Sequence, residues 1–143
     1  MSSAVDHMLE TITYSEIGYQ PVVDYNGWRV AVLNYHYELL PENILSFHKH
    51  NDTDEVFILV QGNCVLYLAE GQDTVTAIHG VQLQIGTVYN VKRGVWHSHT
   101  LSRDARVMIV ENTDTGDHNS PKCRLSAENR KQLRQIAANY VIE

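Results

Sequence analysis

The stretch FHKHNDTDEVFILVQG, residues 47–62, places two histidines and a glutamate around a short polar turn. His48 and His50 are separated by one residue, and side chains at positions i and i+2 of a β-strand point to the same face, about 6.5–7 Å apart. Two imidazoles can therefore lean toward one metal ion, at the usual bond length of about 2.0–2.1 Å. Glu55 follows the turn and opens an apolar strand, so its carboxylate can face the same pocket.

A further histidine lies much later in the chain, in the segment Arg93-Gly-Val-Trp-His97. Gly94 supplies a turn that would start another antiparallel strand, with His97 near its beginning. The spacing alone leaves open whether His97 meets the first three residues. The alternative interpretation is that each of these histidines lies on a surface turn.

Together, the two segments resemble the two sequence motifs of the cupin superfamily. The matching patterns are His48-x-His50-x4-Glu55-x6-Gly62 and Gly86-x5-Lys92-x-Gly94-x2-His97. The resemblance covers about residues 42–101. Three positions differ from the family pattern, and none of them is a metal ligand: Glu42 replaces a glycine, Lys92 a proline and Leu101 an asparagine.

The resemblance implies a β-barrel with one divalent transition-metal ion near the floor of an internal pocket. In that arrangement His48, His50, Glu55 and His97 hold the ion. Imidazole and carboxylate ligands suit Fe, Mn, Ni, Co, Cu and Zn alike, so the metal stays unidentified at this point. Three nitrogens and one oxygen leave one or two open positions on an octahedral ion, where a substrate or water can bind.

The segments around these motifs have the composition of β-strands. Turn signals recur every few residues between Gly62 and Arg103, and the intervening segments are rich in Val, Ile, Leu, Tyr and Thr. Strands are predicted over residues 55–60, 64–68 and 106–110, and one longer strand over residues 28–37 after the Asn26-Gly27 turn. The predicted fold class is all-β: a cupin-type double-stranded β-helix, or jelly-roll barrel, over residues 1–112, with a C-terminal α-helix.

The last part of the chain changes character. Residues 113–125 are rich in Gly, Asn, Asp and Pro and are predicted to form a connecting loop. Residues 126–143 are predicted to form a helix with Ser126 as its N-cap. Apolar residues at 133, 136, 137, 140 and 141 recur at the spacing of one helical stripe. This stripe should pack on the barrel or on a partner chain.

Composition limits the partners of the protein. The chain has 143 residues, a net charge of −6 and no cluster of Lys and Arg, so we do not expect nucleic acid as a partner. The first 25 residues contain no apolar run of the length of a signal peptide or membrane anchor, and we expect a cytoplasmic protein without membrane attachment. Sheet edges and the helical stripe favour a homodimer.

Several further residues are candidates for roles in catalysis. His99 shares the inward face of its strand with His97 but lies too far along for direct metal ligation, so it is either a group that contacts the substrate or a core histidine. Tyr35 and Tyr37 share one face of the predicted strand 28–37, and Asn34 and His36 share the other. One of these pairs should line the pocket. His99, Tyr35 and Tyr37 are the candidate catalytic residues.

Two functional hypotheses are considered. The first, whose reaction classes are implied by the resemblance to cupins, is a metal-dependent dioxygenase, isomerase or lyase that acts on a small polar molecule such as a sugar or a keto acid. The second is a non-catalytic module that binds a metal or a metabolite, because fold and ligands do not establish turnover. Arg29 and Arg106 could anchor an anionic substrate, although arginine on a strand is more often solvated.

Overall fold

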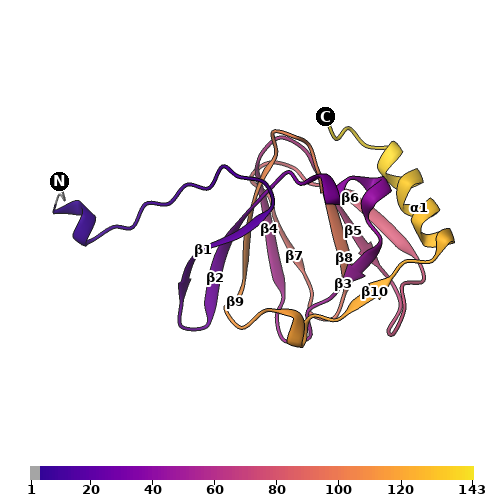
Figure 1. Ribbon diagram of the computed structural model, residues 1–143, viewed down its shortest axis with the longest axis horizontal. Coiled ribbons are helices and arrows are strands. Elements are labelled where there is room, and N and C mark those ends of the chain that lie inside the picture. Colours follow the sequence, from indigo (N-terminus) through magenta and orange to yellow (C-terminus); the bar gives the residue numbers. More distant parts are fainter. Residues whose placement is uncertain (1–3) are drawn as a thin grey trace.

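Two antiparallel sheets packed face to face make up most of the molecule (Figure 1). The structure is a computed structural model that describes residues 4–143. The first sheet has the strand order β1 (Tyr19–Tyr25), β2 (Trp28–Asn34), β9 (Arg106–Asn112), β4 (Glu55–Gln61) and β7 (Val88–Val91). The second has the order β10 (Lys122–Arg124), β3 (Ser46–His48), β8 (Trp96–Leu101), β5 (Cys64–Ala69) and β6 (Ile78–Gln82). The all-β class is confirmed.

Helical elements are few and short in the described part of the chain. The C-terminal helix α1 spans Ala127–Ala138. Four 3-10 turns precede it along the chain: η1 (Val5–His7), η2 (Tyr37–Leu39), η3 (Pro41–Asn43) and η4 (Asp117–Asn119). Residues 4–143 contain no helix with the length and apolar character needed to cross a membrane.

Strand alternation places the core between the two sheets and two carboxylates at its edge. Phe57 of β4 lies opposite Ile109 of β9, and both are buried in a core cluster that includes residues of the facing sheet. Side chains two positions apart on a strand share a face, so Glu55 of β4 points inward like Phe57, and Glu111 of β9 points inward like Ile109. The two glutamates lie at the same end of these paired strands. Both glutamates are buried. The strand pairing therefore brings two acidic groups side by side at the rim of the apolar core.

Strand β8 is buried on both of its faces. Its inner face meets the first sheet, while Trp96 on its outer face joins a second apolar cluster with Leu133 and Ala137 of α1. The helix thus packs on the barrel through the predicted stripe. Its N-cap is Ser126, whose Oγ accepts a hydrogen bond of 3.0 Å from the Asn129 amide, as predicted.

The turn after β4 depends on a glycine of the first motif. Gly62 has a positive φ of 75°, and a Cβ atom at this position would lie 2.6 Å from the Cα atom of Ala105. Any larger residue would be strained by both its φ angle and this contact. This explains the turn glycine at the end of the His48–Gly62 pattern.

The predicted strand over residues 28–37 is too long. β2 ends at Asn34, and the His36 side chain accepts a hydrogen bond of 3.1 Å from the Glu38 amide, which caps the 3-10 turn η2. A polar side chain that bonds the local backbone in this way competes with the extended conformation. Tyr35 and Tyr37 therefore do not share the face of one strand.

Both ends of the chain also differ from prediction. The predicted loop over residues 113–125 contains β10, in which Cys123 pairs with Phe47 of β3. Helix α1 ends at Ala138, so Val141 of the predicted stripe lies beyond it and is exposed. Before β1, the chain extends away from the barrel as an arm (Figure 1).

Candidate metal centre

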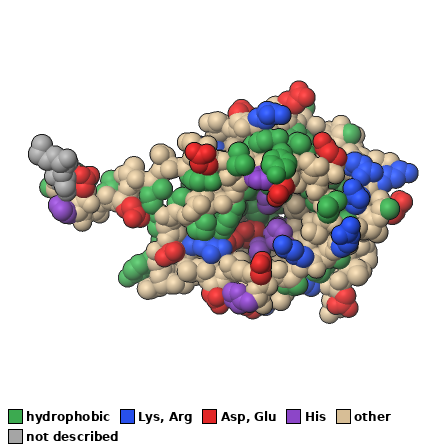
Figure 2. Space-filling view, viewed as in Figure 1, with side chains coloured by type: hydrophobic (Ala, Val, Ile, Leu, Met, Phe, Trp, Pro, Cys, Tyr) green, Lys and Arg blue, Asp and Glu red, His purple; other side chains and the backbone are tan. Residues whose placement is uncertain are grey.

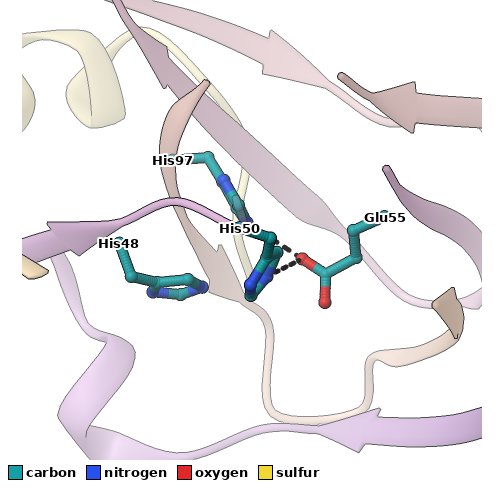
Figure 3. A group of neighbouring side chains, drawn as sticks. All are labelled: His48, His50, Glu55 and His97. Carbon is teal, nitrogen blue, oxygen red and sulfur yellow. Dashed lines mark hydrogen bonds and ion pairs between the residues drawn. The ribbon is translucent and has the colours of Figure 1, made fainter. Parts of the chain in front are cut away.

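The two sheets bring the four predicted ligands together (Figure 3). His48 ends β3 and lies opposite His97 of β8 in register. His50 follows β3, and Glu55 begins β4 in the facing sheet. Their candidate ligand atoms all lie within 4.8 Å of one another. Residues from two motifs, far apart along the chain, thus meet as one cluster.

Hydrogen bonds on the outer side of two histidines fix the orientation of their rings. His97 Nδ1 lies 2.9 Å from the carbonyl oxygen of Val95, and His50 Nδ1 lies 2.7 Å from Ser120 Oγ. The Nε2 atoms of both rings point inward, 2.9 Å and 3.2 Å from Glu55 Oε1. Metal-binding histidines are usually held in this way, with one nitrogen bonded to the protein and the other facing the ion.

The arrangement around His97 fits a bound cation. Since the Val95 carbonyl can only accept a hydrogen bond, His97 Nδ1 carries a hydrogen, and Nε2 is the nitrogen that faces Glu55 Oε1. The contact between Nε2 and the carboxylate oxygen requires a proton or a cation between the two atoms. Two donors bonded to one ion at about 2.1 Å and at right angles lie about 3 Å apart. The donor types and their spacing therefore suit a divalent transition metal.

Charge and burial act strongly on the cluster. Burial, followed by electrostatic interaction with His97, lowers the pKa of His48 to about 3. Burial acts to raise the pKa of Glu55, but hydrogen bonds with His50 and His97 outweigh it and hold that pKa well below its usual range. The neutral imidazole and the ionised carboxylate are the forms that bind metal.

A cavity of about 490 Å³ opens beside the cluster. Figure 2 shows the opening, with histidine, acidic and basic side chains gathered around a hollow in the surface. Its apolar wall includes Leu33 and Ile109, and His48, His50 and Glu55 line its metal side. The volume lies within the range of small-molecule sites, about 300–1,000 Å³.

A second polar group, which we call the glutamate wall, lines the same cavity and consists of Tyr19, Arg29 and Glu111. Glu111 Oε2 accepts hydrogen bonds of 2.6 Å from the Tyr19 hydroxyl and 2.9 Å from Arg29 Nε, and a further bond from Arg29 Nη2. Burial, followed by contact with Glu55, raises the pKa of Glu111 to about 7. The wall holds a carboxyl group rigidly beside the metal cluster.

Solved structures with this arrangement of strands identify the fold. A cupin-2 domain protein from Shewanella frigidimarina superposes with a TM-score of 0.51 and 20% identity, over 69% of this chain and 84% of the other. A protein with a double-stranded β-helix domain from Klebsiella pneumoniae superposes with a TM-score of 0.53 and 15% identity, over 87% and 97% of the two chains. The chain has the cupin fold.

Pac13 from Streptomyces, a nucleoside dehydratase whose structure with uridine is known, also shares this cupin fold. Its TM-score is 0.53 at 12% identity, over 80% of this chain and 85% of Pac13. No protein-family model matches the sequence, and no curated protein matches it significantly. At these identities the likeness concerns the fold alone.

His99 lies inside the cupin barrel, as strand alternation predicts. It lines the cavity and packs against Phe57, with ring centroids 5.6 Å apart. Its Nδ1 atom is buried without a hydrogen-bond partner among the described residues. Burial lowers the pKa of His99 to about 4, which keeps the ring neutral. A role in binding substrate stays a prediction.

The structure places Tyr35 and Tyr37 away from the metal cavity. Tyr37 is 56% exposed and stacks on His36 at 4.7 Å. Tyr35 lies under the guanidinium of Arg103 and lines a separate pocket of about 200 Å³. Of the two candidate pairs, only His36 lines the cavity, whereas Asn34, the last residue of β2, lines the separate pocket with Tyr35. Geometry therefore gives neither tyrosine a position at the metal centre.

Sequence reasoning missed Tyr19 and Glu111. A signal for Glu111 was present, because it follows Val107 and Ile109 in the inward alternation of its strand. Arg29 was considered as an anchor for an anion, but in the structure it is paired with Glu111. Arg106 bonds to Asn34 and to the Tyr14 carbonyl, outside the cavity.

Proposed function

We propose that this cupin is a metal-dependent enzyme that acts on a small polar molecule bound in the 490 Å³ cavity. The observation that carries the proposal is the convergence of His48, His50, Glu55 and His97 in one cluster, of which His48, His50 and Glu55 line that cavity. A purely structural metal site is closed by protein ligands. Here the cluster borders space in which a substrate fits.

The four residues would hold one divalent ion of Fe, Mn, Ni, Co, Cu or Zn. When bound, such an ion supplies Lewis-acid, templating or redox chemistry. The candidate reaction classes are accordingly those of dioxygenases, isomerases and lyases. Pac13, with the same fold, is a dehydratase, which supports including lyases among them.

The remaining cavity residues would position the substrate. Glu111 is fixed by Tyr19 and Arg29, so its carboxyl group can accept a proton or a hydrogen bond at a defined place. His99 offers a neutral ring nitrogen from the neighbouring sheet. Leu33 and Ile109 provide apolar surface that excludes water from one side of the bound molecule.

The test is turnover by protein reconstituted with each of the six metals in turn. The panel contains sugars, nucleosides, diketones and dicarboxylates, with products followed by mass spectrometry, and oxygen uptake recorded for the redox-active metals. We expect turnover of one class with one or two metals, and its loss in His97→Ala. Ligand binding without turnover under every metal would identify a non-catalytic binding module instead. Full activity after chelation would refute the metal-dependent mechanism.

A further inference from the structure

Arg29 is the most buried cationic side chain in the cavity, and it is already occupied. Its Nε and Nη2 atoms bond to Glu111, Nη1 bonds to the Thr113 carbonyl at 3.2 Å, and Nη2 also bonds to the Thr115 carbonyl at 3.0 Å. Four of its five N–H donors are therefore used. Arg29 positions Glu111 and is not available to hold an anionic substrate.

The charge balance of the cavity also disfavours an anion. Among the described residues that line it, four side chains carry carboxyl groups and two are cationic: Glu38, Glu55, Glu111 and Asp117 against Arg29 and Lys122. A bound divalent ion would only bring this balance to zero. Lys122 is exposed and has no acidic partner within ion-pair distance in residues 4–143. The interior thus has no surplus positive charge for a carboxylate or phosphate.

The polar side chains that face the cavity suit hydroxyl groups. Glu111 Oε2 accepts the hydrogen bonds from Tyr19 and Arg29, and the Glu111 carboxyl group also hydrogen-bonds to Glu55, so a ligand at this wall meets a carboxyl group held in place. His99 lines the cavity and its Nδ1 atom has no hydrogen-bond partner among the described residues, and an imidazole ring can both donate and accept hydrogen bonds. A hydroxyl group can both donate to a carboxylate and accept from an imidazole. A carboxylate ligand would instead place its negatively charged oxygens beside the Glu111 carboxyl group, which repels them.

We propose that this cavity binds a neutral, hydroxyl-rich molecule of about monosaccharide or nucleoside size, with Glu111 as the residue that rejects anionic analogues. Leu33, Leu39 and Ile109 supply the apolar surface on which the C–H face of a ring packs. The inference rests on the proposed function only in taking this cavity as the binding site.

Matched ligand pairs test the inference on the intact protein. Calorimetry with Zn²⁺-loaded protein and with metal-free protein compares glucose with glucuronate, glycerol with glycerate and uridine with uridine 5′-monophosphate. Zn²⁺ has no redox chemistry, so binding is measured apart from oxidation or reduction. We expect at least one neutral member to bind about tenfold or more tightly than its anionic partner. Tighter binding of the anionic members, or no binding of any neutral member at millimolar concentration, would overturn the proposal.

Glu111→Gln then tests the residue. The amide keeps the size and hydrogen-bonding capacity of the side chain but removes its charge, so discrimination against the anionic member should shrink about tenfold. Glu10→Gln, on the exposed N-terminal arm, makes the same change outside the cavity and should leave the preference unaltered. Unchanged discrimination in a folded Glu111→Gln protein would remove Glu111 from the proposal. If this variant does not fold, the wild-type pairs still decide the ligand class.

The outcome is distinguishable from failure of the proposed function. A neutral ligand that binds but is never converted would refute the enzyme and leave the ligand class standing. Conversion of a dicarboxylate or a phosphate ester, by contrast, would support the enzyme and refute the ligand class.

Discussion

The metal cluster and the glutamate wall line the same cavity, yet the chain encodes them in different ways. Three of the four cluster residues lie within residues 48–55, and the fourth belongs to a second short pattern. The wall joins residues that are far apart in the sequence. Tyr19 lies 92 positions before Glu111, and Arg29 lies 82 positions before it. Local spacing encodes the first region, whereas the pairing of β1, β2 and β9 creates the second.

The two regions also differ in what completes them. In the cluster, His97 Nε2 faces a carboxylate oxygen, so a cation or proton is needed between them. In the wall, Glu111 already has Arg29 as its ion-pair partner. Substitutions in the cluster should therefore change metal content, and substitutions in the wall should change stability and ligand binding while the metal stays.

The largest effect should come from the double variant His48→Ala, His50→Ala. Two of the four ligands are lost together, so metal retention should be abolished. Elemental analysis of the purified protein measures this. The control is His79→Ala, His118→Ala, since these histidines are exposed and lie outside the cluster. Metal content equal to wild type in the first double variant would show that the cluster is not the metal site.

A comparison of His97→Ala with His99→Ala should give the next largest difference. Both changes remove one imidazole from the inner face of β8, but only His97 belongs to the cluster. His97→Ala should deplete metal, whereas His99→Ala should retain it and weaken ligand binding or turnover about 10- to 100-fold. Metal analysis and calorimetry separate the two. Equal metal loss would place His99 among the ligands, and an unchanged His99→Ala protein would make it a core residue.

Much of the fold could be predicted because the strands near the motifs carry their own signals. The predicted strands 55–60, 64–68 and 106–110 correspond to β4, β5 and β9. The end of β2 could not be predicted, because it depends on a hydrogen bond between the His36 side chain and the Glu38 amide. β10 was missed as well, since this three-residue strand is stabilised by pairing with β3 and has no pattern of its own.

The residues of the candidate site also differ in whether the sequence predicts them. His48, His50, Glu55 and His97 follow from residue type and spacing. The glutamate wall does not, because a glutamate at the end of a strand usually lies in solvent, and only the register of β4 with β9 buries this one. Register is a tertiary property. A sequence pattern shows which face a residue occupies, but not which residue faces it from the next strand.

Within the wall, Arg29→Met should have the larger effect on stability. The change keeps the apolar stem but leaves Glu111 without its cation, and loss of one partner of a buried ion pair costs about 3–5 kcal/mol. Because the Arg29 side chain is 16% exposed, we expect about 2–4 kcal/mol. Urea denaturation of metal-free protein measures it. Arg134→Met on the exposed face of α1 is the control. A cost below that of the control would mean that the ion pair does not stabilise the fold.

The smallest effect should come from Tyr19→Phe, which removes a single hydroxyl group from the wall. This hydroxyl donates to Glu111 Oε2 at 2.6 Å, and a hydrogen bond to a charged group contributes about 1.5–3 kcal/mol. Tyr19 is 39% exposed, so water can replace part of the hydrogen bond, and we expect the free energy of unfolding to fall by about 1 kcal/mol.

Tyr25→Phe provides a matched control, because Tyr25 lies on the same strand, is 64% exposed and makes no hydrogen bond through its hydroxyl in the described structure. Urea denaturation of both variants subtracts the general cost of losing a tyrosine hydroxyl from β1. If the two variants lose the same stability, Arg29 alone holds Glu111, and Tyr19 contributes only its ring to the cavity. If Tyr19→Phe costs more and also weakens binding of the neutral ligand while metal content is unchanged, the wall acts on the ligand independently of the cluster.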